Sequence, residues 1–127
     1  MTEDDKKRLR LDPDGLLSYA FLANNMGSCT PEDLTELIDI MRTVDLTGQF
    51  LASAARYLHA IDPDGFEDQV RTLVAATIDK DREHKYLPEL MTSLYGADCL
   101  ERREQLCASD DNFRRIYKRL YPEPNKI

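Results

Sequence analysis

Residues 61–78 read IDPDGFEDQVRTLVAATI and contain the pattern on which the prediction of the fold rests. Within them, residues at i, i+4, i+7, i+8 and i+11 mark one face of an α-helix. These residues are Phe66, Val70, Leu73, Val74 and Thr77. Asp62 and Pro63 are typical of an N-cap and of the first residue of a helix. The stretch therefore predicts an amphipathic helix in mid-chain, whose apolar face other helices must cover.

The segments before this stretch carry apolar patterns of the same kind. Thr30 and Pro31 suit an N-cap and a first helical position, and the helix after them is predicted to turn one face inward. That face consists of Leu34, Leu37, Ile38 and Met41. The next helix is expected to begin at Asp45 or Thr47. An earlier helix, residues 16–26, is apolar on nearly every side.

The segments after it continue the pattern. Residues 79–85 are mostly charged and lose the apolar face, so that either an exposed helix or a loop fits them. We favour a helix that frays into a loop. Three further helices are predicted, and they begin at Pro88, Ala97 and Ser109.

The alternation of β-branched and polar residues that marks strands is not found in the sequence. We therefore expect an all-α fold, a compact single-domain bundle of six or seven short amphipathic helices. Residues 1–10 are almost entirely charged and are predicted to form an N-terminal arm. Residues 11–121 are predicted to form the helical domain, and residues 122–127 a C-terminal tail.

Length and composition are those of an ordinary globular chain. The 127 residues are 42% hydrophobic and 32% charged, which favours one folded domain. No apolar run approaches the roughly 20 residues that span a bilayer, and no apolar segment of a secretory signal follows the first residues. Three cysteines without CxxC spacing favour buried thiols over disulfides or a zinc site. We expect a cytoplasmic protein without a membrane partner.

The net charge of −7 is unevenly distributed along the chain. Residues 1–29 carry a net charge of −1, residues 30–99 a net charge of −8, and residues 100–127 a net charge of +2. The acidic middle would repel a polyanion such as DNA, and the end would attract it only weakly. Nucleic acid is therefore not the expected partner.

One short motif occurs twice, as LDPDG at residues 11–15 and as IDPDG at residues 61–65. Its aspartates and glycine suggest a calcium loop, but position 1 of an EF-hand would fall on Arg10 and Ala60 instead of aspartate. Helix capping explains both copies without a metal. The similarity ends soon after the motif, so repeated use of a helix start is favoured over duplication.

Catalytic and cofactor signatures are not found. His59 and His84 have no neighbours at metal-ligand spacing, and the sequence contains neither GxSxG nor a glycine-rich phosphate loop. We predict no enzyme activity, no metal site and no cofactor. If the protein were an enzyme, Tyr57 and Tyr86 together with the two histidines would be the first residues to suspect.

The last predicted helix has a basic strip beside its apolar face, formed by Arg114, Arg115, Lys118 and Arg119. These four residues are the candidate binding site. One interpretation is docking to a phosphate backbone or to an acidic protein surface. The other, which we favour, is that cations near a helix C-terminus pair with the acidic middle of the same molecule.

These observations favour a small non-catalytic helical protein that acts through protein–protein interaction, as a regulator, an adaptor or an immunity-type partner. A homodimer is one form of this hypothesis, because the helix at residues 16–26 is apolar enough to need a second subunit. The alternative is a nucleic-acid-related protein, in which the basic C-terminal helix contacts phosphate or the acidic middle mimics nucleic acid.

Overall fold

The computed structural model describes residues 1–122, and this part of the chain is all-α, with no strand. The predicted fold class is confirmed, and the described part has eight α-helices where six or seven were expected. They are α1 (Glu3–Arg10), α2 (Leu16–Asn25), α3 (Pro31–Val44), α4 (Gln49–Ile61), α5 (Glu67–Lys80), α6 (Leu87–Tyr95), α7 (Arg103–Ser109) and α8 (Asp111–Leu120). A 3₁₀ turn, η1 (Met26–Ser28), follows α2. None of these helices has the length and apolar character needed to cross a membrane.

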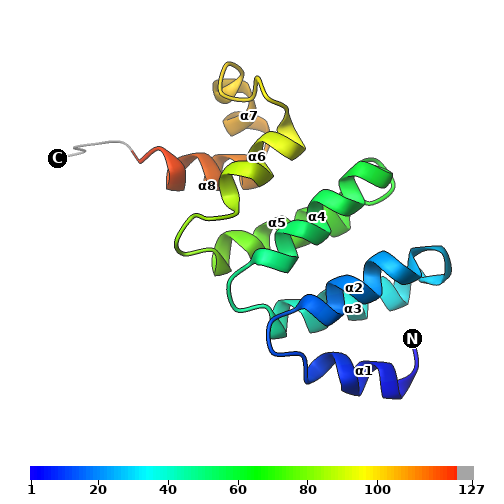
Figure 1. Ribbon diagram of the computed structural model, residues 1–127. Helices are drawn as coiled ribbons and strands as arrows, with labels where there is room; N and C mark the ends of the chain where they lie inside the picture. The colour runs from blue at the N-terminus through cyan, green and yellow to red at the C-terminus, as the bar shows by residue number, and fades with distance from the viewer. Residues whose placement is uncertain (123–127) are drawn as a thin grey trace.

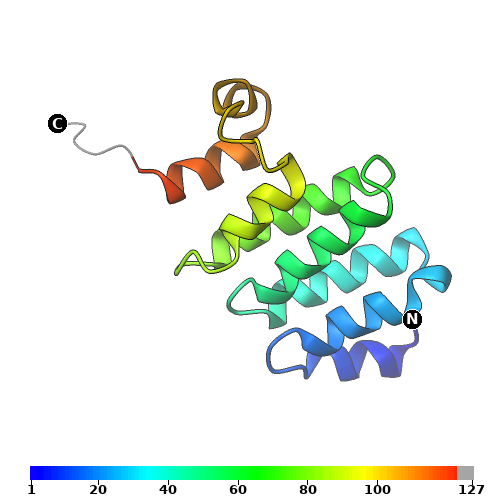
Figure 2. The ribbon, with the colours of Figure 1, turned by 45° about the horizontal axis from the view of Figure 1, so that its top comes forward.

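The first six helices form three antiparallel hairpins that stack in two layers (Figures 1 and 2). Layer A contains α1, α3 and α5, and layer B contains α2, α4 and α6. Within layer A, α3 packs against α1 and α5, and within layer B, α4 packs against α2 and α6. Between the layers, α3 packs against α2 and α4, and α4 also packs against α5. Helical repeat proteins stack in the same way. The last pair departs from it, since α8 packs against both α5 and α6 while α7 packs on α8.

Helix α3 lies at the centre of layer A and was predicted correctly. The Thr30 side chain accepts a hydrogen bond from the backbone of Asp33, whose carboxylate accepts one from the Thr30 backbone, so that a capping box starts the helix. The predicted inward face is buried, as are Ile40 and Val44. Each such aliphatic side chain contributes about 2 kcal/mol when it is removed from water.

Helix α5 begins later than the sequence predicted. It starts at Glu67, and Asp62 is the C-cap of α4, donating its backbone N–H to the carbonyl of Leu58. Pro63 has no N–H with which to continue α4, so residues 62–66 form the reversal between the two helices. The predicted inward face of α5 is buried from Val70 onward, and Phe66 packs half-buried against it.

Residues 3–10 form a helix, although the sequence predicted a solvated arm. Thr2 and Asp5 make a capping box, Leu9 is buried, and Lys6 Nζ lies 2.7 Å from Glu36 Oε2 of α3. One buried leucine was too little apolar pattern to predict a packed helix, because the face that covers it belongs to α3. Of the tail predicted at residues 122–127, residues 123–127 lie outside the described part of the chain.

Three turns on one edge of the stack join layer A to layer B, and each is built on a buried aspartate. In each turn one carboxylate oxygen accepts the backbone N–H groups five and six residues further on, which open the next helix. Asp45 Oδ2, for example, lies 2.9 Å from the nitrogens of both Phe50 and Leu51. Asp12 and Asp81 make the equivalent pairs at 2.8–3.2 Å. We call these three residues the aspartate ladder.

The third residue after each of these aspartates has a positive φ. It is Gly15 (102°), Gly48 (88°) and His84 (57°). The first two also touch the next turn, since a Cβ at Gly15 would lie 3.2 Å from the Cβ of Asp45. The third turn has no further turn of this kind beside it in the described chain. A residue with a side chain, His84, is therefore accommodated at this position.

The duplicated LDPDG and IDPDG motifs are not equivalent in the structure. Asp12 belongs to the aspartate ladder and joins the two helices of one hairpin. Asp62 is exposed and lies in the connection between two hairpins, where it accepts a hydrogen bond from the Gly65 backbone. The structural repeat therefore relates Asp12 to Asp45 and Asp81, and the similarity of the two motifs reflects turn chemistry.

Candidate functional site

The predicted basic strip lies on α8, where two of its arginines hold the helix against α5. Arg115 Nη2 is 2.9 Å from Asp79 Oδ1, and Arg119 Nη1 donates to the carbonyl of Ile78 at 2.7 Å. Both contacts lie at the C-terminal end of α5, where the helix dipole favours a positive charge. These side chains thus contribute to packing α8 on the acidic middle of the molecule.

The other two residues of the strip lie on α8 away from α5. Arg114 pairs with Asp111 one turn earlier on the same helix. Lys118 is exposed and forms no salt bridge within residues 1–122. The contacts therefore agree with the interpretation that these cations serve the molecule's own fold.

The structure does not bring together the four residues that were suspected for catalysis. Tyr57 faces α2, where its ring packs edge-on against Tyr19 with ring centres 6.4 Å apart. His84 and Tyr86 lie in the connection between α5 and α6. Only His59 lines the pocket described next.

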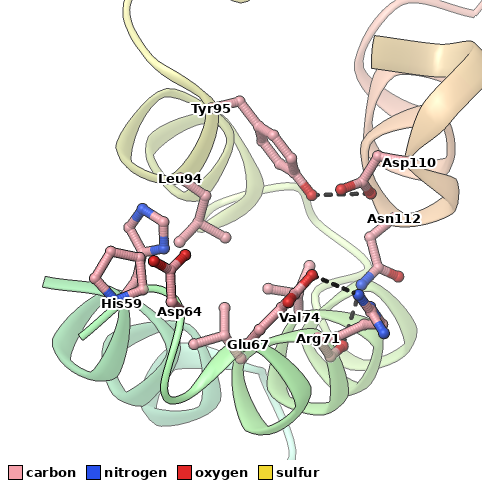
Figure 3. A pocket seen from close by; sticks show the side chains of 11 residues that line it. His59, Asp64, Glu67, Arg71, Val74, Leu94, Tyr95, Asp110 and Asn112 are labelled. Atoms are coloured by element: carbon pink, nitrogen blue, oxygen red, sulfur yellow. Dashed lines mark hydrogen bonds and ion pairs between the residues drawn. The ribbon is translucent and has the colours of Figure 1, made fainter. Parts of the chain in front are cut away.

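A pocket of about 280 Å³ lies where α8 meets the stack (Figure 3). Its walls come from the end of α4 and the connection after it, from α5, from the end of α6 and from the start of α8. Apolar side chains form one part of its lining, and titratable side chains form the rest. The titratable residues are His59, Asp64, Glu67, Arg71, Tyr95 and Asp110.

Three polar side chains of this pocket, Tyr95, Asp110 and Asn112, hold the elements around it together. The hydroxyl of Tyr95 donates to Asp110 Oδ1 at 3.1 Å, and the same oxygen accepts the Phe113 backbone N–H at 2.9 Å as the N-cap of α8. Asn112 donates its amide to the carbonyl of Arg71 at 3.1 Å, which ties the start of α8 to α5. These hydrogen bonds therefore attach the last helix pair, α7 and α8, to the stack.

The chemistry of Tyr95 fits this structural role. Burial raises the pKa of the Tyr95 phenol well above its ordinary value, and the charge of Asp110 and the hydrogen bond to it raise this pKa further. The phenol stays protonated at neutral pH and can only donate to Asp110. Within residues 1–122 no three His, Cys, Asp or Glu side chains come together in an arrangement that would hold a metal ion.

The two layers of the stack differ sharply in charge. In layer A, seven of the 8 residues of α1, five of the 14 of α3 and five of the 14 of α5 are charged. In layer B, α2 has no charged residue, α4 has only Arg56, and α6 has only Glu89. These two side chains form a salt bridge with each other. The outside of layer B therefore has almost no unpaired charge.

The outside of layer B also exposes apolar and aromatic side chains. Leu16 is 51% exposed, and Tyr19, Phe50 and Tyr57 form a half-buried aromatic cluster between α2 and α4. We define the uncharged face as the solvent side of α2 and α4, at Leu16, Tyr19, Ala20, Phe50, Ser53 and Tyr57. It is the best candidate for a functional surface in the described chain.

Sequence reasoning missed this face, although a signal for it exists. Residues 16–29 and residues 46–55 contain no charged residue in a chain that is 32% charged. These two uncharged segments form one surface only because α2 packs against α4 in layer B. The aspartate ladder was missed for a similar reason, because its three turns share little sequence beyond the aspartate.

Comparisons with known proteins found no match to this chain among family models, curated proteins or solved structures.

Proposed function

We propose that this protein is a non-catalytic binding module that acts through protein–protein interaction, and that the uncharged face is its contact surface. The observation that carries the proposal is the separation of charge between the two layers. The cores of protein interfaces are depleted in charged residues and enriched in aromatic ones. A contiguous apolar area on an otherwise charged molecule is typical of a binding surface.

The shape of layer B also supports the proposal. Its helices have 9 to 13 residues and lie side by side, as neighbouring helices do at a spacing of about 10 Å. Three such helices provide an area comparable to one side of a standard interface, about 800 Å². The Arg56–Glu89 salt bridge lies between α4 and α6, so the area around α2 and α4 can be desolvated without leaving a charge unpaired.

The remaining surfaces support a binding function less well. In the pocket at α8, Tyr95 binds Asp110 and Asn112 binds the carbonyl of Arg71, and the arginines of the basic strip are bound to α5 or α8. The form of the nucleic-acid alternative in which the basic C-terminal helix contacts phosphate depends on that strip and is therefore not favoured. We further propose that the protein acts in the cytoplasm, which is supported by its three free cysteines.

Site-specific photo-crosslinking tests the contact surface. A photoreactive amino acid is placed at Ala20 or at Ser53 on the uncharged face, and at Thr43 on α3 as the matched layer A control. After irradiation in the native cell, Ala20 and Ser53 should give the same crosslinked protein, and Thr43 should give none. Equal crosslinking from both layers, or none from the uncharged face, would contradict the proposal.

A second variant tests whether the crosslinked protein binds at the uncharged face. Ala20→Glu places a charge at the centre of the exposed side of α2 and should remove the product formed from Ser53. Its circular dichroism should match that of the unsubstituted protein, because Ala20 is half-exposed. A product from Ser53 that persists in Ala20→Glu would show that the partner binds elsewhere.

A further inference from the structure

The two ends of the stack differ. Helix α8 packs against α5 and α6 and thus covers the C-terminal end. At the other end, the hairpin α1–α2 has no element of the described chain against its outer side (Figure 1). In repeat proteins the end units need a polar outer surface to stay soluble. The outer side of α1–α2, which we call the N-terminal end face, is only partly polar.

On α1 this end face combines two opposite charges with a leucine. Asp4, Lys7 and Leu11 follow the i, i+3, i+7 spacing and lie roughly opposite the buried Leu9. Leu11 is 83% exposed. Within residues 1–122 neither Asp4 nor Lys7 forms a salt bridge, whereas the adjacent Lys6 binds two glutamates. Two unpaired charges of opposite sign thus lie one helical turn apart.

On α2 the end face is mainly apolar, with the exposed Asn24 beside its apolar residues. Leu17, which is 44% exposed, and Phe21 lie one turn apart on the flank opposite Tyr19, which faces α4. Phe21 lines a groove of about 370 Å³ together with Asp5 and Arg8 of α1. Leu17 lies about 100° around α2 from Leu16 of the uncharged face, which is the angle between successive residues of a helix.

We propose that a second copy of this chain binds the N-terminal end face about a two-fold axis that runs across both helices. Such an axis places α1 antiparallel to α1 of the second copy, and α2 antiparallel to α2. Asp4 of each copy then faces Lys7 of the other. Phe21 lies near the middle of α2 and packs close to its own counterpart, with Leu17 beside it. Both the charges and the apolar residues of the face are thereby complemented.

Two features of the structure favour a second copy over an unrelated partner. The acidic residue precedes the basic one along α1, so an antiparallel copy of the same helix satisfies both charges at once. In the described part of the chain the stack also has one open end, since α8 covers the other. Head-to-tail assembly would need two free ends and is therefore not favoured. A two-fold dimer uses the same face of both copies and needs only one.

Charge reversal with restoration tests this interface by sedimentation velocity from about 1 μM to about 1 mM protein. Asp4→Lys and Lys7→Glu each place two like-charged pairs in the dimer and should raise its dissociation constant about tenfold. The double variant D4K/K7E recreates both pairs with their signs exchanged and should return the dissociation constant to within about threefold of the starting value. Glu104→Lys, an exposed position on α7, is the control and should have no effect.

Three outcomes would overturn the proposal. They are a monomer throughout the concentration range, a double variant as weak as the single ones, and growth beyond a dimer. Leu17→Asp adds an apolar test, since it should abolish the dimer while circular dichroism shows the helical content unchanged. The proposed dimer interface lies on a different side of α2 from the uncharged face. Dimerisation can therefore be absent while crosslinking from Ser53 persists, and crosslinking can be absent while the dimer forms.

Discussion

Gly48 packs directly against Asp81, so that a Cβ at Gly48 would stand 3.4 Å from both the Cβ and the backbone nitrogen of Asp81. The left-handed residue of one turn thus touches the buried aspartate of the next. Because Gly15 has the same relation to Asp45, the aspartate ladder sets the distance between successive hairpins. Substitutions in these turns test whether the ladder stabilises the stack.

Asp45 is the most heavily bonded residue of the ladder. Its carboxylate accepts four backbone N–H groups, from Thr47, Gly48, Phe50 and Leu51, at 2.9–3.1 Å. Asp45→Ala should lower the free energy of unfolding by about 3 kcal/mol, since several donors would lose their partner. Asp45→Asn keeps one oxygen and should lose less. Urea titration measures both values.

The control for Asp45 is an aspartate that lies outside the ladder. Asp62 is exposed and accepts one backbone hydrogen bond, from Gly65. Asp62→Ala should therefore lower the free energy of unfolding by less than about 1 kcal/mol. Equal losses for Asp62→Ala and Asp45→Ala would contradict a special role of the ladder.

Gly48→Ala tests the contact between turns. The substitution forces a side chain into a φ of 88° and brings the new methyl group against Asp81 and Thr77. It should lower the free energy of unfolding by about 1–2 kcal/mol. Gly27 has no positive φ and no atom within 4 Å of a new Cβ, so Gly27→Ala should be neutral or slightly stabilising. Thermal unfolding compares the two variants.

His84→Gly should stabilise the protein. His84 has a φ of 57°, a conformation that costs a residue with a Cβ about 1 kcal/mol. Part of this gain is lost because glycine makes the unfolded chain more flexible, so we expect a net gain of about 0.5 kcal/mol. Lys85→Gly, at the next residue and without positive φ, should instead destabilise. A melting temperature of His84→Gly at or below that of the unsubstituted protein would contradict this account.

Stability should fall in acid partly through Asp12. Burial raises the pKa of Asp12, but the backbone N–H groups of Asp14, Ser18, Gly15 and Leu17 outweigh burial and lower the pKa below its usual 3.8. A carboxyl whose pKa is lower in the folded state contributes stability above about pH 4 and loses it as the pH falls through the folded value. The free energy of unfolding should therefore decrease below about pH 4, and less steeply in Asp12→Asn. Urea titrations at several pH values measure the slope.

Local sequence chemistry was sufficient where a helix start and its inward face lie close together in the chain. Thr30 begins α3 through a capping box, as predicted, and Asp110 caps α8 by accepting the Phe113 N–H, one residue after Ser109, at which this helix was predicted to begin. The start of α5 was misplaced because the sequence motif Asp62–Gly65 suits both a helix start and a reversal. In the structure α4 continues to Ile61, directly before the motif, so the motif forms a reversal between two helices instead of a helix start.

The candidate site was harder to predict, because its features depend on contacts between distant helices. The positions of Arg115 and Arg119 on the last helix were predicted, and so was the preference for pairing with the acidic middle. The partners Asp79 and the carbonyl of Ile78 could not be named before α8 was placed on α5. The uncharged face likewise exists only because α2 and α4 lie side by side.

The aspartate ladder occupies one edge of the stack, and within residues 1–122 no carboxylate at the opposite edge accepts a pair of N–H groups five and six residues further on. One inserted residue within 12–18, 45–51 or 81–87 would move the donating backbone N–H groups out of reach of the carboxylate that accepts them. The connections at residues 26–30 and 62–66 have no such constraint. Insertions, whether in evolution or by design, are therefore expected in these two connections between successive hairpins. A peptide is best grafted at the same edge.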